Sequence, residues 1–198
     1  MIIIPARIGS SRFPNKVLAD IGGMPMVVRT AKAVEDIDDV VIATDSQEVV
    51  EMASKHDIKA VLTSTEHQSG TDRIYEAAQK LDLDEDEIVI NVQGDEPFIE
   101  SEVVQAIYDL TKANRENERI MMNSCYKTIS NPEADDPNIV KVVTDNDDIA
   151  LYFSRAKVPD PRDHHFDAYK GHLGIYGFTV RSLQKFCMLE PAPLEDIE

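Results

Sequence analysis

The feature that most constrains the fold is an alternation of short apolar runs with helical patterns along the first part of the chain. Continuous apolar runs of this length are typical of strands buried in a parallel sheet. Strands that alternate with helices predict a mostly parallel sheet with right-handed crossovers and helices on both faces, a Rossmann-like α/β fold. Strands are expected at 1–5, 40–44, 60–62 and 88–92, and helices at 26–34, 46–56, 71–81 and 101–114.

The second part of the chain has a different pattern. Strands are expected at 120–128, 139–144, 149–154 and 171–178, followed by a helix at 180–189. Residues 145–148 form the turn of a predicted hairpin, which indicates an antiparallel extension of the sheet. The polar stretch 158–170, with two prolines and a His pair, predicts a mobile loop. Because no linker composition interrupts the chain, we predict a single domain over residues 1–198.

Composition limits the classes of function. The chain has 198 residues and a net charge of −17, which argues against a general nucleic-acid binder, because phosphate backbones need clustered cations. Two cysteines, Cys125 and Cys187, exclude a disulfide scaffold and a Cys-x-x-Cys zinc or redox motif. No basic leader opens the chain, and no run approaches the roughly 20 apolar residues of a membrane span. We therefore expect a soluble cytoplasmic protein with reduced thiols.

The loop after the first strand concentrates positive charge. It carries Arg7, Arg12 and Lys16 beside Ser10 and Gly9, in a chain that is otherwise strongly acidic. The loop follows a buried strand, so it lies at the carboxyl edge of the sheet, where open α/β sheets bind ligands. Three cations around small residues suit a triphosphate, more than they suit a merely solvated loop. Neither a P-loop spacing nor a Gly-x-Gly-x-x-Gly motif is present.

Asp95 is expected at the same edge of the sheet, because it follows the strand at 88–92 and precedes Pro97. A carboxylate in this place suits a Mg²⁺ ion held against phosphate oxygens. A turn Asp that caps the next segment fits the position equally well. After the strand at 40–44, either Asp45 or Ser46 is expected to cap the next helix, and Asp45 is interpreted as a cap rather than a ligand.

The segment 67–73 offers groups that could contact a nucleotide base. Gln68, Ser69 and Arg73 provide donors and acceptors, and Gly70 permits close approach. The signal is weak on its own, because Ser69 would serve equally as a helix cap. The pair at 164–165 lacks the spacing of metal ligands and is interpreted as surface.

Six segments, in order along the whole chain, together resemble the family of 3-deoxy-manno-octulosonate (Kdo) cytidylyltransferases, the CMP-Kdo synthetases. They are IPARxxSSRFPxK at 4–16, HQSGTDR at 67–73, NVQGDEP at 91–97, LYFSRA at 151–156, HLGIYG at 172–177 and PLExIE at 193–198. The first segment is shared with other sugar nucleotidyltransferases. The segments HQSGT, VQGDEP and HLGIYG in succession are highly specific.

The resemblance implies a Rossmann-like nucleotidyltransferase, usually a homodimer, that transfers CMP from CTP to the anomeric hydroxyl of Kdo for lipopolysaccharide assembly. It also implies roles for particular residues. Arg7, Ser10, Arg12 and Lys16 would bind the nucleotide phosphates, with Arg12 and Lys16 stabilising the departing pyrophosphate; Gln68, Ser69, Gly70 and Arg73 would lie around the cytosine; Asp95 would bind the catalytic Mg²⁺; and Gln93, Arg155, His172, Tyr176 and Glu195 would line the sugar side.

One departure and several alternatives accompany this resemblance. The family continues past the PLExIE segment by several tens of residues, which include an Asp that completes the metal site. We therefore expect a nucleotidyltransferase domain that lacks the family's C-terminal segment, with metal affinity, dimer, activity and stability in question. The alternatives are the same chemistry on an 8-amino Kdo analogue, a CMP-sialic acid synthetase (whose segments match less well), a CTP-binding protein without turnover, and an acidic structural protein without a ligand.

Overall fold

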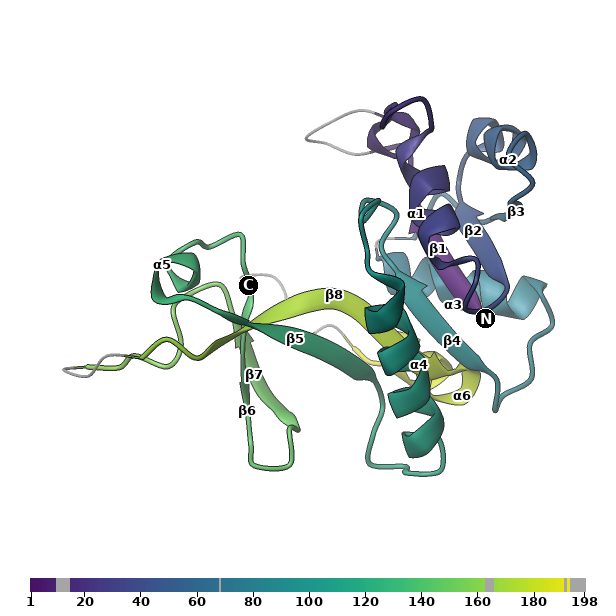
Figure 1. Ribbon diagram of the computed structural model, residues 1–198. Coiled ribbons are helices and arrows are strands. Elements are labelled where there is room, and N and C mark those ends of the chain that lie inside the picture. Colours follow the sequence, from purple (N-terminus) through teal and green to yellow (C-terminus); the bar gives the residue numbers. More distant parts are fainter. Residues whose placement is uncertain (10–14, 68, 163–165, 191, 193–198) are drawn as a thin grey trace. The chain divides into compact units, whose positions relative to one another are not determined.

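The computed structural model in Figure 1 describes residues 1–9, 15–67, 69–162, 166–190 and 192. The chain divides into two compact units. The first contains Met1–Asn123 and Ile175–Leu189, and the second contains Ser124–Gly174 and Glu190–Glu198. A single domain over residues 1–198 stays a prediction. The boundary falls within two strands, β5 (Asn123–Ile129) and β8 (Tyr169–Thr179), so no change of composition marks it.

The first unit is an α/β sheet in the strand order β3-β2-β1-β4-β8. The strands β1 to β4 are parallel, and β8 joins β4 antiparallel, with Ile88 opposite Thr179. Its elements are β1 (Ile2–Ala6), the 3₁₀ turn η1 (Lys16–Leu18), α1 (Met26–Val34), β2 (Val40–Thr44), α2 (Gln47–Ser54), β3 (Lys59–Leu62), α3 (Gly70–Lys80), β4 (Ile88–Val92), α4 (Ser101–Asn114) and α6 (Val180–Cys187). The predicted bounds of α1, β2, β4 and α4 are confirmed, whereas η1 was not predicted.

Helices cover both faces of this sheet, as predicted. Helices α1 and α4 contact each other on one face, and α3 and α6 contact each other on the other (Figure 1). The core under α3 and α6 includes Ile3, Ile74, Val89, Phe178 and Leu183, all fully buried. Strand β4 is buried along its whole length, which explains why all its residues except Asn91 are apolar. The carboxyl ends of β1 and β4 therefore have a rigid base.

The second unit contains the rest of β5 and β8 together with α5 (Asn131–Ala134), β6 (Lys141–Thr144) and β7 (Ala150–Ser154). Strands β6 and β7 form the predicted antiparallel hairpin, and Lys141 also pairs with Gly171 of β8. Helix α5, which was not predicted, begins with a capping box between Ser130 and Glu133. The small core contains Ile129, Ala134 and Tyr169. Strand β8 begins at Tyr169, inside the stretch 158–170 that was predicted as a loop.

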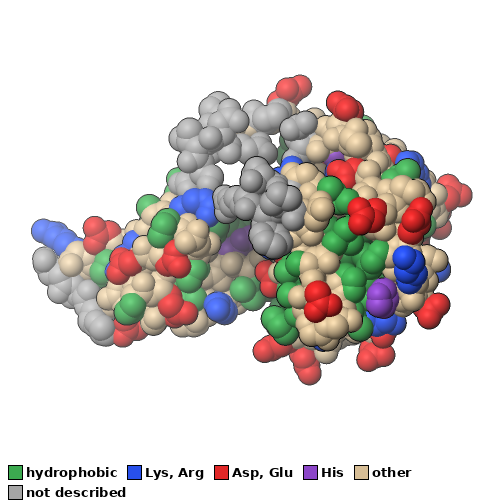
Figure 2. Space-filling model, turned by 90° about the horizontal axis from the view of Figure 1, so that it is seen from above, with side chains coloured by type: hydrophobic (Ala, Val, Ile, Leu, Met, Phe, Trp, Pro, Cys, Tyr) green, Lys and Arg blue, Asp and Glu red, His purple; other side chains and the backbone are tan. Residues whose placement is uncertain are grey.

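The surface and the thiols fit the composition. Acidic side chains are spread over the face seen in Figure 2 rather than gathered in one patch. Both cysteines are free. Burial raises the pKa of Cys125 to about 11, and burial together with nearby Asp72 raises the pKa of Cys187 to about 12, so both thiols stay protonated at neutral pH. Within the described part of the chain, no helix has both the length and the apolar character that a membrane crossing requires.

Candidate active site

Pro5, near the end of β1, is where two of the predicted binding segments meet. A Cβ added to Gly70 would lie 3.3 Å from the Pro5 ring, and a Cβ on Gly94 would lie 2.9 Å from the Pro5 carbonyl oxygen. At Gly94 only a residue without a Cβ allows such an approach to backbone. The start of α3 and the turn after β4 thus both pack against the carboxyl end of β1, where ligands of open α/β sheets bind.

Lys16 and Asp95 form an ion pair at this edge of the sheet. The distance from Lys16 Nζ to Asp95 Oδ2 is 2.6 Å, and the two side chains are 41% and 45% exposed. An exposed pair of this kind contributes little to stability. Its consequence is local: it brings a cation of the segment predicted to bind phosphate to the carboxylate expected at the metal. Burial and the neighbouring charge of Asp95 raise the pKa of Glu96, and Lys16 partly opposes them.

A hydrogen bond from α1 holds the turn that carries Asp95. Thr30 is fully buried, and its hydroxyl donates to the carbonyl oxygens of Met26, at 3.1 Å, and Gly94, at 3.3 Å. The second contact joins α1 to the residue directly before Asp95. Sequence reasoning missed Thr30, because a Thr inside an amphipathic helix carries no sign of a partner 64 residues away.

A Mg²⁺ ion fits this edge if the nucleotide supplies most of its ligands. Among the described residues, no three His, Cys, Asp or Glu side chains gather into a group that could hold a metal. Asp95 offers one half-exposed carboxylate, the type of donor that Mg²⁺ prefers. Protein Mg²⁺ sites commonly combine one or two carboxylates with substrate phosphates and water. Asp95 together with phosphate oxygens meets that requirement.

The side chain of Arg73 is buried rather than exposed at the site. Its side chain is 3% exposed, and Nη2 lies 2.9 Å from Asp45 Oδ2. Nη1 donates to Thr63 Oγ1 at 2.6 Å and to the Ser64 carbonyl at 3.2 Å. Of the two expected helix caps, Asp45 and Ser46, the structure has Ser46 as the N-cap residue of α2, and Asp45 pairs with Arg73 instead. A contact between Arg73 and a base stays a prediction.

Helix α3 holds the segment expected around the base. Ser69 is its N-cap, accepting from the Asp72 amide at 3.1 Å and donating to Asp72 Oδ2 at 2.7 Å. Gly70 is the first helical residue. Gln68 lies outside the described residues, as do Ser10 and Arg12 of the first loop. Arg7 directly follows β1 and is exposed.

Glu76 of α3 accepts hydrogen bonds from three donors, two in the loop before α3 and one in α3 itself. It accepts from the Ser64 amide at 2.8 Å and from Lys80 at 2.7 Å, and it is hydrogen-bonded to His67. Burial disfavours the charged carboxylate, but these hydrogen bonds outweigh it and lower the pKa of Glu76 to about 2. The turn that leads to Ser69 is therefore tied to α3 through a carboxylate.

Two residues expected on the sugar side lie near the end of β4. Gln93 Nε2 donates to Asn91 Oδ1 at 3.5 Å, and Tyr176 of β8 is paired with Asn91 across the strands. Asn91 is buried, and its Nδ2 has no hydrogen-bond partner in the described part of the chain. Gln93 and Tyr176 are thus both adjacent to the same buried amide in the first unit.

Two further sugar-side residues belong to the second unit. Arg155, just after β7, donates from Nη1 to the Pro137 carbonyl at 3.1 Å. His172 Nε2 lies 2.9 Å from Ser124 Oγ, and its ring meets the Phe153 ring edge-on at 4.9 Å. Burial lowers the pKa of His172, so the imidazole is neutral at pH 7. The last predicted sugar-side residue, Glu195, lies outside the described residues.

Lys141 supports Arg155 from within the second unit. The side chain is fully buried, and its Nζ donates to the carbonyl oxygens of Asp136 at 3.0 Å, Ile139 at 2.7 Å and Arg155 at 2.6 Å. Several carbonyl oxygens replace part of the hydration that a buried ammonium loses. Lys141 therefore fixes the backbone of the residue that follows β7. A lysine at the start of an expected strand gave no sign of this role.

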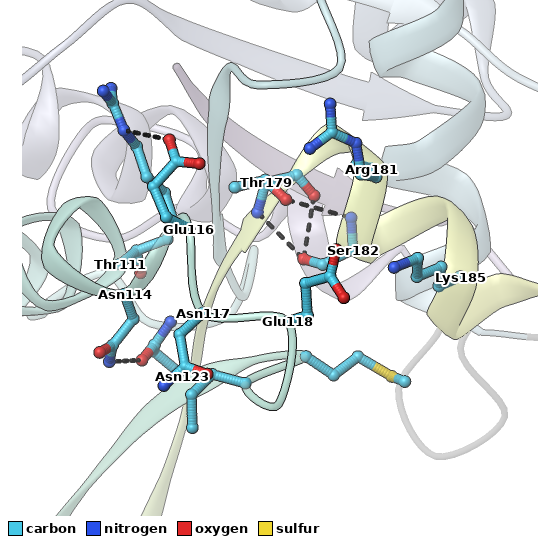
Figure 3. Close-up of a pocket in the computed structure, with 13 residues that line it drawn as sticks. Thr111, Asn114, Glu116, Asn117, Glu118, Asn123, Thr179, Arg181, Ser182 and Lys185 are labelled. Carbon is cyan, nitrogen blue, oxygen red and sulfur yellow. Dashed lines mark hydrogen bonds and ion pairs between the residues drawn. The ribbon is translucent and has the colours of Figure 1, made fainter.

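A polar pocket of about 100 Å³ lies at the other end of the sheet (Figure 3). It is lined by the segment between α4 and β5 and by the start of α6, including Thr179, which pairs with Ile88 at the amino end of β4. Its groups are paired among themselves: Asn114 with Asn123 at 2.8 Å, and Thr179 with Ser182 at 3.1 Å. It takes no part in the site at the carboxyl ends.

Comparison with known proteins shows the family of this chain. The family model described as cytidylyltransferase matches residues 1–198. A 3-deoxy-manno-octulosonate cytidylyltransferase of a Nitratiruptor species is 54% identical over 198 residues, which cover all of this chain and 83% of the relative. A protein of the same name from Wolinella succinogenes is 50% identical over 202 residues, with the same coverage. The chain belongs to the 3-deoxy-manno-octulosonate cytidylyltransferase family.

A solved structure of this family supports the same fold. The structure described as CMP:2-keto-3-deoxy-manno-octonic acid synthetase complexed with CTP is 37% identical, with a TM-score of 0.88 over 99% of this chain and 80% of that one. The Rossmann-like nucleotidyltransferase fold that the resemblance implied for this chain is thereby confirmed.

Proposed function

We propose that this chain transfers CMP from CTP to the anomeric hydroxyl of Kdo and releases pyrophosphate, a step of lipopolysaccharide biosynthesis. The observation that carries the proposal is the Lys16–Asp95 pair at the carboxyl edge of the sheet, 2.6 Å apart, in a chain of this family. Attack on an α-phosphate needs positioning and neutralisation of charge more than it needs a protein nucleophile. A half-exposed cation beside a half-exposed carboxylate supplies both kinds of group.

The residues divide by the part of the reaction they serve. In this proposal Arg7, Ser10, Arg12 and Lys16 bind the triphosphate, and Lys16 and Arg12 stabilise the charge that develops on the departing pyrophosphate. Asp95 holds the metal. A Mg²⁺ ion bound there would neutralise the phosphate oxygens and lower the pKa of the attacking sugar hydroxyl.

The remaining residues orient the two substrates. Gln68, Ser69 and Gly70 lie around the cytosine, with Arg73 behind them. The neutral imidazole of His172 can accept or donate one hydrogen bond to a sugar hydroxyl. The sugar side is formed by Gln93, Arg155, His172, Tyr176 and Glu195. The proposal includes a homodimer, and it places the enzyme in the cytoplasm, where CTP is made.

The experiment is pyrophosphate release by the 198-residue chain with CTP, Mg²⁺ and either Kdo or its 8-amino analogue. Release with Kdo in preference to the analogue supports the proposal, and preference for the analogue assigns the other acceptor. CTP binding without release from either sugar would replace the proposal with a nucleotide-binding protein that has no turnover. Absence of both binding and release would refute the assignment of the site.

Asp95→Asn tests the role of the carboxylate. We expect kcat to fall about 10²–10³-fold, as when a preorganised charged group is removed, while CTP binding measured by calorimetry is largely preserved. Asp109→Asn is the matched control, because Asp109 is exposed on α4, where it accepts a hydrogen bond from Gln105. Full activity of Asp95→Asn would contradict the proposed metal site.

A further inference from the structure

We propose that the largely buried pair Asp45–Arg73 is a positioning device for the two described ends of the predicted phosphate loop, at Ile8 and at Asn15–Lys16, and that Arg73 acts through Asp45 rather than by touching the nucleotide. The inference rests on the proposed function only for its activity readout. It assigns a role to Asp45 that neither the sequence motifs nor the resemblance suggested. It also gives Arg73 a role other than the predicted contact with cytosine.

The two oxygens of Asp45 have different partners. Oδ2 lies 2.9 Å from Arg73 Nη2, and Oδ1 accepts from the amide of Ile8 at 3.3 Å. Ile8 follows Arg7, at the point where the chain leaves β1 and enters the predicted phosphate loop. One carboxylate, whose side chain is 15% exposed, therefore connects α3 to the point where the chain leaves β1.

Ile8 also closes the loop at its base. Its carbonyl oxygen accepts from the amide of Asn15 at 3.4 Å. Asn15 has a left-handed backbone with φ of 56° and is followed by Lys16, whose ammonium lies 2.6 Å from Asp95. A continuous series of contacts thus leads from Arg73 through Asp45, Ile8 and Asn15 to the Lys16–Asp95 pair.

The burial of the pair explains why it can hold a position. The side chains of Arg73 and Asp45 are 3% and 15% exposed, and Arg73 is held by Thr63 and Ser64 as well. A guanidinium with three acceptors in fixed directions has one favourable orientation. Removal of one partner leaves a buried charge uncompensated, so the other must move or recruit water. Either change is transmitted to the Ile8 amide, because that amide shares the same carboxylate.

The two roles of Arg73 make different predictions for a ligand that has no base. Inorganic tripolyphosphate engages the phosphate loop but offers no cytosine. If Arg73 contacts the base, Arg73→Met leaves the affinity for tripolyphosphate intact. If the pair positions the loop, Arg73→Met and Asp45→Ala both weaken the binding of tripolyphosphate. Calorimetry with tripolyphosphate therefore separates direct contact from positioning.

The experiment compares wild type with Asp45→Ala, Arg73→Met, the double variant and Arg73→Lys. Val104→Ala in α4 is the control for lost stability, because Val104 is fully buried and has no part in the series of contacts. We expect each single variant to weaken tripolyphosphate binding about tenfold, since sub-ångström displacement of binding groups has effects of this order. The double variant should be no weaker than the worse single, and Arg73→Lys should recover part of the loss.

Two further readouts complete the test. Hydrogen exchange at the Ile8 amide should accelerate about tenfold in Asp45→Ala and Arg73→Met, but not in Val104→Ala. With CTP and Kdo, KM for CTP should rise and kcat should fall in the same variants. Affinity for tripolyphosphate within about twofold of wild type, in a folded Asp45→Ala, overturns the inference. If wild type shows no turnover, the proposed function fails, while calorimetry and exchange still decide this inference.

Discussion

Glu76 should make the stability of the first unit depend on pH in a predictable way. Its pKa is lowered from 4.5 to about 2 in the folded chain, and its side chain is 21% exposed. A group with a depressed folded pKa contributes stability that is fully present above the unfolded value. That contribution is lost as the pH falls from about 4.5 through about 2, because the unfolded chain binds the proton first.

The magnitude follows from the shift. A change from 4.5 to about 2 corresponds to about 3 kcal/mol of differential interaction. The Lys80 side chain is about half exposed, so solvent screens part of this interaction. We expect Glu76→Gln to lower the free energy of unfolding by about 2 kcal/mol at pH 7. At pH near 2 the difference between wild type and variant should approach zero.

The assay is urea-induced unfolding of both chains between pH 7 and pH 2, followed by circular dichroism. The matched control is Glu35→Gln, which removes a carboxylate paired with Lys32 on the surface of the first unit. The control should change stability by less than about 0.5 kcal/mol and show little dependence on pH. A difference between wild type and Glu76→Gln that stays constant from pH 7 to pH 2 would refute the reasoning.

Three further substitutions test packing around the two units. Gly94→Ala places a Cβ 2.9 Å from a backbone oxygen of β1, so we expect a loss of about 1–3 kcal/mol and a roughly tenfold lower kcat. At Gly9 an added Cβ meets nothing within 4 Å among the residues that the structure describes, so Gly9→Ala should leave unfolding within about 0.5 kcal/mol of wild type. Lys141→Met removes the buried ammonium that donates to three part-buried carbonyl oxygens, one of which, that of Asp136, still accepts from the Ile139 amide. Thermal unfolding should show a loss of about 1–3 kcal/mol, and an unchanged Tm would contradict this. Gly177→Ala makes a Cβ overlap the Thr111 hydroxyl and should lower the free energy of unfolding by about 2 kcal/mol. Thr111→Ala in the same chain should restore part of that loss, which a double-mutant cycle in urea would measure.

The fold could be predicted largely because its strands are buried on both faces. The runs at β1, β2 and β4 are apolar for that reason apart from Thr44 and Asn91, and their ends in the sequence place Lys16 and Asp95 at one edge of the sheet. The boundary between the two units was not predictable, because it falls inside β5 and β8, where the local pattern remains that of a strand.

The site shows the same division between local and distant information. A basic loop after a strand is visible in the sequence because charge and position are local properties. The partners of Asp45, Thr30 and Lys141 are not visible, since each depends on which distant backbone or side chain the folded sheet brings into hydrogen-bond distance. From the sequence, Asp45 is compatible with a helix cap, because its pairing with Arg73 exists only in the folded chain.

The sequence by itself determined the class of fold and the family to which the chain belongs, and it predicted the edge of the sheet for ligand binding, because periodicity, turn residues and ordered motifs are properties of the linear chain. Only the tertiary structure decided that Arg73 is buried against Asp45 and that Lys141 holds the backbone of Arg155. Burial and pairing of charges arise from contacts between residues far apart in the chain. Such contacts are set by strand order and register, which no local pattern records.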